Sequence, residues 1–244
     1  MKDLGSSIEH INSAINPEEA FNRFCSIMSN YGYERVAYSL ITDHPSLSLP
    51  KQHGLATSYP AHWMKHYNEN KYLARDPVVI GILKSRVPFF WDDLRKDKDI
   101  PESSLKILDQ GSESGVKDGI AIPLFGVTGE VVGLGLARKE GEKGRDYDLL
   151  ASVHLLSTYF HEKYRSLITN PVVSKITIRE RDILSWATEG KTDEEIAQIL
   201  NISANTVRWH WKKIFVKLET HGRLYSITKA IMTGLVTPNY IAPH

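Results

Sequence analysis

Residues 177–218 read TIRERDILSWATEGKTDEEIAQILNISANTVRWHWKKIFVKL, and this stretch predicts three helices separated by sharp turns. Two capping boxes, each a threonine followed three residues later by a glutamate, start the first two helices at Thr177–Glu180 and Thr192–Glu195. Gly190 is placed to end the first helix, because the left-handed conformation needed there is unstrained only for glycine. A short helix, a tight turn and a longer helix together predict a helix-turn-helix.

The third helix carries the features of a nucleic-acid reader. Its apolar residues Val207, Ile214 and Leu218 share one stripe, and the chain between residues 203 and 224 holds five basic residues against one acidic residue. Amide and guanidinium groups suit base edges, lysines suit phosphates, and an aromatic ring can lie on a sugar or a thymine methyl. The residues of these types that point away from the stripe are Asn205, Arg208, Trp209 and Lys212.

The ordered pattern I-T-x-R-E-R-D-I-L…G-K-T…E-I-A-x-I-L-x-I-S-x-N-T-V-R…H…K-L resembles the DNA-binding domain of the LuxR family of transcription regulators. The resemblance covers about the last 65 residues and implies a homodimer on an inverted repeat of double-stranded DNA, with RNA polymerase as a further partner. This chain departs from the family at Lys213, where members often carry Asn. The predicted DNA-binding residues are Thr192, Ser203, Asn205, Thr206, Arg208, Trp209, Lys212, Lys213 and Lys217.

Charge is unevenly distributed along the 244 residues, although the whole chain has a net charge of only +1. Residues 171–244 hold ten Lys and Arg against seven Asp and Glu, whereas residues 1–170 hold 20 against 22. This asymmetry fits a basic module attached to a nearly neutral one. A single cysteine, the lack of an apolar leader and the lack of a long apolar run predict a cytoplasmic protein without a membrane segment.

The rest of the chain alternates helical and strand patterns, which predicts an α+β fold: an N-terminal α/β/α sandwich with an antiparallel sheet, followed by the small all-α domain. We expect a sensor domain over 1–167, a linker over 168–176 and the helix-turn-helix domain over 177–244. Expected strands cover 33–42, 119–126 and 130–138, with a tight hairpin through 127–129. Expected helices cover 5–31, 60–75, 77–85, 102–114 and 146–166.

Aromatic residues and one aspartate form a distinctive pattern before residue 92. It reads Tyr59-Pro60-x-x-Trp63-x-x-x-Tyr67…Asp76-Pro77…Trp91. Taken residue by residue, the pattern also fits an ordinary aromatic core with an aspartate that caps a helix. Taken with the C-terminal domain, it is similar to the autoinducer-binding domain of the quorum-sensing branch of the LuxR family, which implies an N-acyl-homoserine lactone as signal ligand and no cofactor.

The chemistry of such a lactone matches these side chains. Its polar head needs a partner for each buried group, because an unpaired group costs several kcal/mol. The Trp63 indole donates only and suits the lactone carbonyl, whereas an ionised Asp76 accepts only and suits the amide N–H. By resemblance, Tyr59 donates to the acyl carbonyl, Tyr67 closes the pocket over the ligand and Trp91 packs on the lactone ring.

Three further positions complete the predicted pocket. Ala37 and Ser39 lie on an expected strand and face the pocket if the strand register is right, because a shift of one residue turns them outward. Gly135 stands where many family members have Ser or Thr near the ligand amide. That hydroxyl is missing here, so a 3-oxo group on the acyl chain is bound through water or is not preferred.

The sequence argues against two alternative functions and leaves a third open. A phosphorylated receiver domain needs an apolar strand that ends in acidic residues, and residues 1–60 show none. A lactone hydrolase needs a metal cluster, but His62 and His66 are joined by no further histidines or paired glutamate, and no nucleophile elbow is present. The third alternative is a regulator of the same family that responds to no lactone.

Overall fold

The computed structural model describes residues 3–43, 49–126, 130–141, 144–168 and 176–237. The chain divides into two compact units, the first built mostly from residues before 169 and the second from residues after them. The expected fold class is confirmed, because the first unit combines an antiparallel sheet with helices and residues 176–237 of the second unit form helices joined by turns. The expected hairpin turn at 127–129 and most of the expected linker lie outside the described residues.

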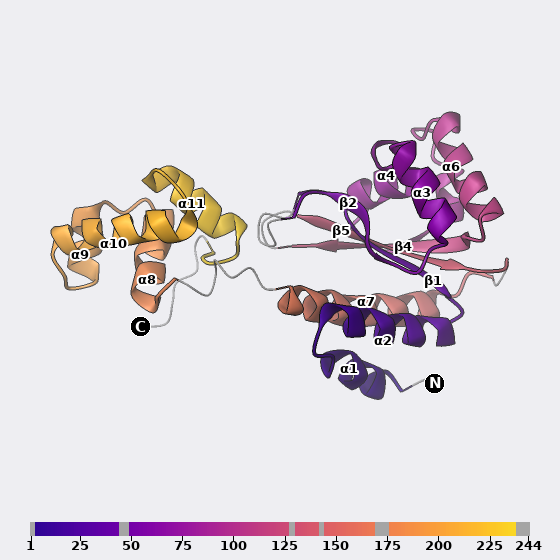
Figure 1. The fold of residues 1–244 in the computed structure, drawn as a ribbon, viewed down its shortest axis with the longest axis horizontal. Helices are drawn as coiled ribbons and strands as arrows, with labels where there is room; N and C mark the ends of the chain where they lie inside the picture. The colour runs from indigo at the N-terminus through magenta and orange to yellow at the C-terminus, as the bar shows by residue number, and fades with distance from the viewer. Residues whose placement is uncertain (1–2, 44–48, 127–129, 142–143, 169–175, 238–244) are drawn as a thin grey trace. The chain divides into compact units, whose positions relative to one another are not determined.

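The first unit is a five-stranded antiparallel sheet between two layers of helices (Figure 1). The sheet order is β2-β1-β5-β4-β3. The strands are β1 Arg35–Leu40, β2 Gln52–Thr57, β3 Phe89–Phe90, β4 Lys117–Phe125 and β5 Val131–Arg138. The helices are α1 Leu4–Asn12, α2 Pro17–Asn30, α3 Ala61–Glu69, the 3₁₀ turn η2 Tyr72–Ala74, α4 Pro77–Lys84, α5 Trp91–Leu94, α6 Glu102–Glu113 and α7 Tyr147–Leu167.

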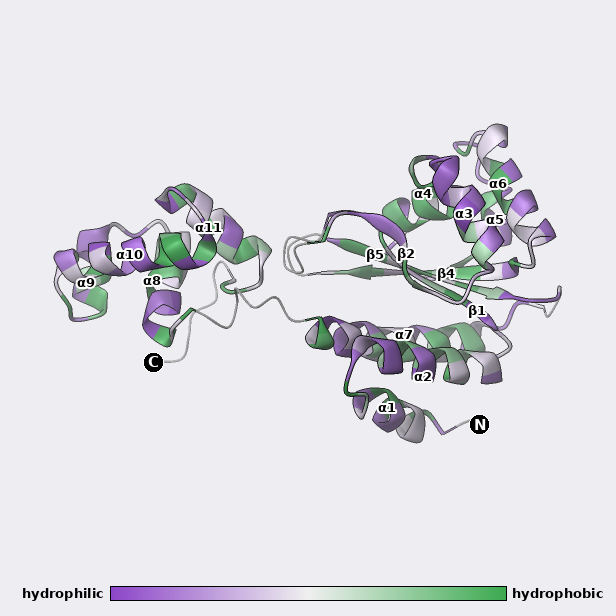
Figure 2. Cartoon of the chain, viewed as in Figure 1, coloured by the Kyte–Doolittle hydropathy of each residue, from purple (hydrophilic) through white to green (hydrophobic). Residues whose placement is uncertain are grey.

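Helices α2 and α7 cover one face of the sheet, and α3 to α6 cover the other (Figure 1). Apolar residues concentrate on β4 and β5, which both helical layers cover (Figure 2). On the α7 side, Phe24 stacks on Phe160 with ring centroids 4.3 Å apart, and the Tyr38 hydroxyl lies 2.9 Å from His161 Nδ1. These side chains form an aromatic core on this face of the sheet. The pocket described below lies on the opposite face.

Strand β2 was not expected from the sequence, and it is irregular. Tyr38 pairs with Ala56 and Leu40 pairs with Gln52, so one β1 residue, Ser39, stands opposite three β2 residues. Gly54 within this bulge has φ +65°, a left-handed conformation that glycine adopts without strain. The sequence QHGLAT is poor in β-branched residues, which explains why it does not read as a strand.

The helix expected over 60–75 is shorter than predicted. Helix α3 ends at Glu69, and Lys71 then adopts φ +53° before the separate turn η2. The left-handed residue redirects the chain, so that Tyr72 is buried and its hydroxyl donates to the Gln110 side chain at 2.8 Å. No helix that the structure describes is long and apolar enough to cross a membrane.

The second unit contains α8 Ile178–Thr188, α9 Asp193–Ile199, α10 Ala204–Leu218 and α11 Arg223–Met232. Both predicted capping boxes are present, with each threonine side chain and glutamate side chain accepting from the other residue's amide. Gly190 follows α8 with φ +78°, as its predicted role requires. The helices pack around the predicted apolar stripe of α10. Trp211 is also part of this core, although the predicted stripe did not include it.

Candidate functional site

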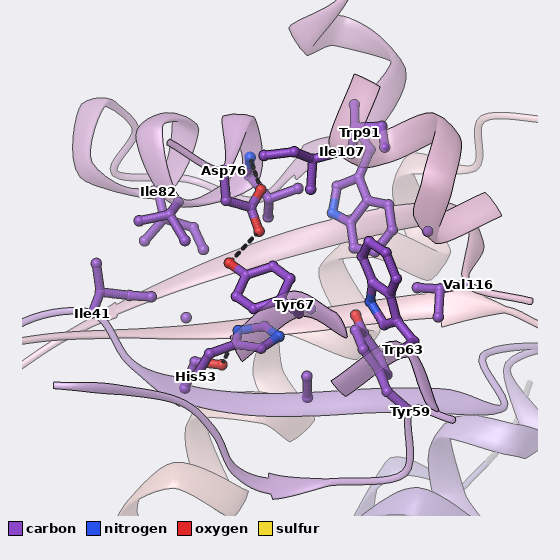
Figure 3. A pocket seen from close by; sticks show the side chains of 18 residues that line it. Ile41, His53, Tyr59, Trp63, Tyr67, Asp76, Ile82, Trp91, Ile107 and Val116 are labelled. Carbon is purple, nitrogen blue, oxygen red and sulfur yellow. Dashed lines mark hydrogen bonds between the residues drawn. The ribbon is translucent and has the colours of Figure 1, made fainter. Parts of the chain in front are cut away.

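The principal pocket lies between the sheet and the layer formed by α3 to α6 (Figure 3). Strands β1 and β5 supply its floor, and helix α3, the start of α4 and the start of α5 supply side chains above it. All eight positions predicted from the sequence line this one pocket: Ala37, Ser39, Tyr59, Trp63, Tyr67, Asp76, Trp91 and Gly135. They come from segments up to 98 positions apart in the sequence, and the fold brings them together.

Asp76 serves two purposes at once. Its Oδ1 accepts from the Val78 amide at 2.8 Å and so caps α4, while its Oδ2 accepts from the Tyr67 hydroxyl at 2.6 Å. The residue is only 6% exposed. Burial raises the pKa of Asp76, and the hydrogen bonds from Tyr67 and from the helix amides oppose that rise. A buried carboxyl with remaining lone pairs is therefore available to accept from a ligand.

Hydrogen-bond donors face the pocket beside this carboxyl. Burial is the main cause that raises the pKa of the Tyr59 hydroxyl, and the nearby Asp76 carboxyl raises this pKa further. The phenol therefore stays protonated. Among the described residues, no side chain or backbone group bonds to Tyr59 Oη. The indole N–H of Trp91 is buried and likewise has no partner within the described parts of the chain. Trp63, 4% exposed, packs edge-on against Tyr67 with ring centroids 5.9 Å apart.

Glycines of β4 and β5 make room for the aromatic side chains. Gly135 of β5 pairs with Ala37 of β1, and a Cβ at Gly135 would lie 2.7 Å from Tyr59 Oη. A Cβ at Gly119 would lie 2.4 Å from the Trp91 ring. Gly135 therefore does more than lack a hydroxyl: its missing side chain leaves the space that the Tyr59 phenol fills.

His53 is a pocket residue that the sequence analysis missed. Its ring stacks on Tyr67 with centroids 4.0 Å apart and planes inclined by 21°, and its Nδ1 lies 3.1 Å from Ser39 Oγ. Nε2 is buried without a partner among the residues the structure describes. Burial lowers the pKa of His53 to about 4, so the ring is neutral at pH 7. The sequence did not indicate strand β2 or its bulge. It therefore had no alternating pattern that would place His53 in a pocket.

The pocket continues into an open groove. The inner cavity measures about 50 Å³, and the groove beside it measures about 650 Å³. Ile41, His53, Tyr67 and Val79 line both and form the wall between them. A cavity of this size holds only a few water molecules. A ligand whose tail is too long for this cavity must therefore displace side chains of this wall and extend toward the groove.

Helix α10 presents an exposed polar face in the second unit. Asn205, Arg208, Trp209, Lys212 and Lys213 are exposed, opposite the buried stripe. The Arg208 guanidinium donates to Asn205 Oδ1 at 2.8 Å and to Glu194 of α9 at 2.7 Å. Lys213 Nζ lies 3.6 Å from the centre of the Trp209 ring. These residues form one surface that combines base-reading and phosphate-binding side-chain types.

The other predicted DNA-binding residues have structural partners. Thr192 and Ser203 cap α9 and α10, and the Ser203 and Thr206 hydroxyls lie 2.8 Å apart. Lys217 lies away from the exposed face and donates to Glu180 at 2.6 and 2.8 Å. Glu180 is 1% exposed, so Lys217 compensates a buried carboxylate within the unit.

Both units match known families. Residues 16–164 match the family described as "Autoinducer binding domain", and residues 174–230 match "Bacterial regulatory proteins, luxR family". The transcriptional activator AhyR of Aeromonas hydrophila is 30% identical over 241 residues, covering 95% of this chain and 91% of that protein. The transcriptional activator LuxR of Aliivibrio fischeri is 31% identical over 189 residues, covering 75% of each chain. SdiA of Escherichia coli has the same fold, with a TM-score of 0.75 at 23% identity over 95% of this chain and 97% of that one.

An autoinducer-binding domain followed by a helix-turn-helix domain defines a two-domain transcription regulator. The chain belongs to the LuxR family of quorum-sensing transcriptional regulators, with an autoinducer-binding domain and a LuxR-type helix-turn-helix domain. Its relatives are named as transcriptional activators and regulators, not as enzymes. In the described residues, no three His, Cys, Asp or Glu side chains gather as they would around a metal ion.

Proposed function

We propose that this chain binds an N-acyl-homoserine lactone in the pocket of its first unit and thereby controls DNA binding by its second unit. The observation that carries the proposal is the gathering of an acceptor and several donors around one buried cavity. Asp76 accepts from the ligand amide, Tyr59 donates to the acyl carbonyl and Trp63 donates to the lactone carbonyl. Tyr67 orients Asp76 and closes the pocket, while Trp91 packs on the lactone ring.

The apolar tail supplies the remaining binding energy. Each buried CH₂ contributes about 0.8 kcal/mol, so the preferred chain length is the one that fills the cavity and its extension toward the groove. Ligand binding stabilises the folded sensor by RT ln(1 + [L]/Kd). We propose the boundaries 1–167 for the sensor, 168–176 for the linker and 177–244 for the DNA-binding domain.

We further propose that the regulator binds an inverted repeat as a homodimer, which would place two copies of α10 one DNA turn apart. Exposed apolar residues on α7 (Leu155, Tyr159) and on α11 (Leu224, Tyr225) are candidate dimer contacts. The exposed lysines Lys212 and Lys213 of α10 contact phosphates, and Asn205 with Arg208 reads base edges. Bound upstream of a promoter, such a dimer can contact RNA polymerase.

Calorimetric titration of the full chain with lactones of four to twelve acyl carbons tests the ligand class. The expected result is one-site binding that is tightest at a single chain length. SdiA has a structure in complex with octanoyl-rac-glycerol, so this ester is a suitable non-lactone arm. Tight binding of the ester with no binding of any lactone would replace the proposal by one in which the signal is a non-lactone acyl compound.

A further inference from the structure

We propose that His53 uses its Nε2–H to bind an oxygen on the acyl chain and so selects oxygen-substituted chains, such as a 3-oxoacyl chain, over unsubstituted ones. This inference rests on the proposed function, because it concerns which lactone the same pocket prefers. It assigns a role to a residue outside the Tyr59–Trp63–Asp76 group that holds the polar head.

The bulge in β2 places His53 where the chain of a ligand must pass. Three β2 residues stand opposite Ser39. One of them is His53, whose side chain lines the pocket. Its ring stacks on Tyr67 and is part of the wall between the cavity and the groove. In Figure 3 the ring lies beneath Tyr67, and one of its nitrogens points toward Tyr59 and Trp63. A head group held by Asp76 therefore leaves its tail beside His53.

The hydrogen bonds of Ser39 decide which nitrogen of His53 carries the proton. Ser39 Oγ accepts from the Gly54 amide at 3.0 Å, and it lies 3.1 Å from His53 Nδ1. Ser39 Oγ has a second lone pair, but if Nδ1–H donated to it, the Ser39 proton would have no acceptor among the described residues. We therefore infer that the Ser39 hydroxyl donates to Nδ1. A neutral imidazole that accepts at Nδ1 carries its proton on Nε2. On this ground we assign Nε2 as a donor that faces the pocket.

The N–H group at Nε2 lacks a hydrogen-bond acceptor. It is buried, it has no partner among the described residues, and a buried unpaired N–H is costly. An acyl-chain oxygen would satisfy it, whereas a plain methylene chain leaves it unpaired. Gly135 of β5 offers no hydroxyl to the ligand. A side chain at this position would collide with Tyr59 Oη, which lies close to where the Cβ would stand. His53 thus supplies from β2 the polar contact that β5 cannot supply.

The test compares matched ligands on the full chain. Octanoyl- and 3-oxooctanoyl-homoserine lactone are titrated against the wild-type protein, His53→Phe and His53→Gln. Wild type is expected to prefer the 3-oxo ligand about tenfold, which is the effect of one satisfied donor. His53→Phe keeps an aromatic ring on Tyr67 but removes the donor, so the preference should disappear. His53→Gln, whose amide can donate, should keep part of it.

A control variant and the possible outcomes separate this inference from the proposed function. His62→Gln changes an exposed histidine of α3 outside the pocket and should keep the wild-type ratio. Equal binding of both lactones by wild type, or a tenfold preference that survives in His53→Phe, would overturn the role of His53 while the lactone site stands. Failure of wild type to bind either lactone would instead overturn the proposed function.

Discussion

The Tyr67 hydroxyl donates to Asp76 Oδ2 at 2.6 Å, and this bond joins α3 to the residue that caps α4. Because Asp76 Oδ1 is held by the Val78 amide, the carboxyl is fixed at both oxygens. Tyr67 is 2% exposed and Asp76 is 6% exposed, so water competes little for this bond. The carboxyl is therefore oriented before a ligand arrives, which reduces the entropy that binding must overcome.

Tyr67→Phe should lower the free energy of unfolding at pH 7 by about 1–3 kcal/mol, because it leaves a buried carboxylate with one partner fewer. The variant should also raise the pKa of Asp76 further, since the Tyr67 bond opposes the effect of burial. A group whose pKa is raised by folding favours the folded state at low pH, so the deficit should shrink as the pH falls. Urea denaturation at pH 7 and pH 5 measures both effects, and a deficit that grows at pH 5 would contradict the account.

Gly135→Ala should displace Tyr59, because the new Cβ would lie 2.7 Å from the phenol oxygen. We expect a loss of about 1–3 kcal/mol in stability, typical of overpacking, together with weaker lactone binding. The next atoms are farther, with Trp91 Cζ2 at 3.5 Å and Tyr59 Cζ at 3.8 Å, so Tyr59→Phe removes the clashing atom. The double variant should recover most of the lost stability. If the two substitutions were simply additive in a thermal unfolding cycle, the clash would not be the cause.

The stability of the protein should depend on pH through His53. Its pKa is about 4 in the folded chain against about 6.5 when unfolded, so protons bind the unfolded chain first as the pH falls. The stability that the neutral His53 contributes is fully present above pH 6.5 and is lost as the pH falls from 6.5 to 4. The loss amounts to about 2 kcal/mol by pH 5. His53→Phe should therefore lose less stability than wild type between pH 7 and pH 5. Parallel pH profiles would show that His53 is not buried in a neutral form.

Two lysines of α10 should separate folding from DNA binding. Lys217 neutralises the buried Glu180, so Lys217→Ala should lower the stability of the second unit by about 1–3 kcal/mol. Lys212 is exposed, so Lys212→Ala should leave stability within about 0.5 kcal/mol and weaken DNA binding with a smaller salt slope. Chemical denaturation and fluorescence anisotropy at several salt concentrations measure the two effects. A stable Lys217→Ala protein with weak DNA binding would make Lys217 a phosphate contact.

Local patterns predicted much of this structure. Both capping boxes and the left-handed Gly190 depend on residues a few positions apart, which the sequence displays directly. Ala37 and Ser39 line the pocket as alternation along a strand predicts.

Features that depend on distant residues escaped prediction. The bulge of β2 lies opposite Ser39 of β1, and His53 within it lines the pocket. The bond from Lys217 to Glu180 joins residues 37 positions apart, and in the sequence Glu180 is recognisable only as part of a capping box. Such contacts are set by tertiary packing, for which a single sequence has no local signal.

The central claim is that Asp76 anchors a lactone head group in the pocket. Asp76→Asn keeps an oxygen that can cap α4 but replaces the acceptor opposite Tyr67 by an amide. Thermal unfolding of the full wild-type chain and of this variant, each with a panel of acyl-homoserine lactones, tests the claim directly. The account predicts a stabilisation of several degrees in wild type that peaks at one chain length and is absent in Asp76→Asn. An equal shift in both proteins, or none in a well-folded wild type, would contradict it.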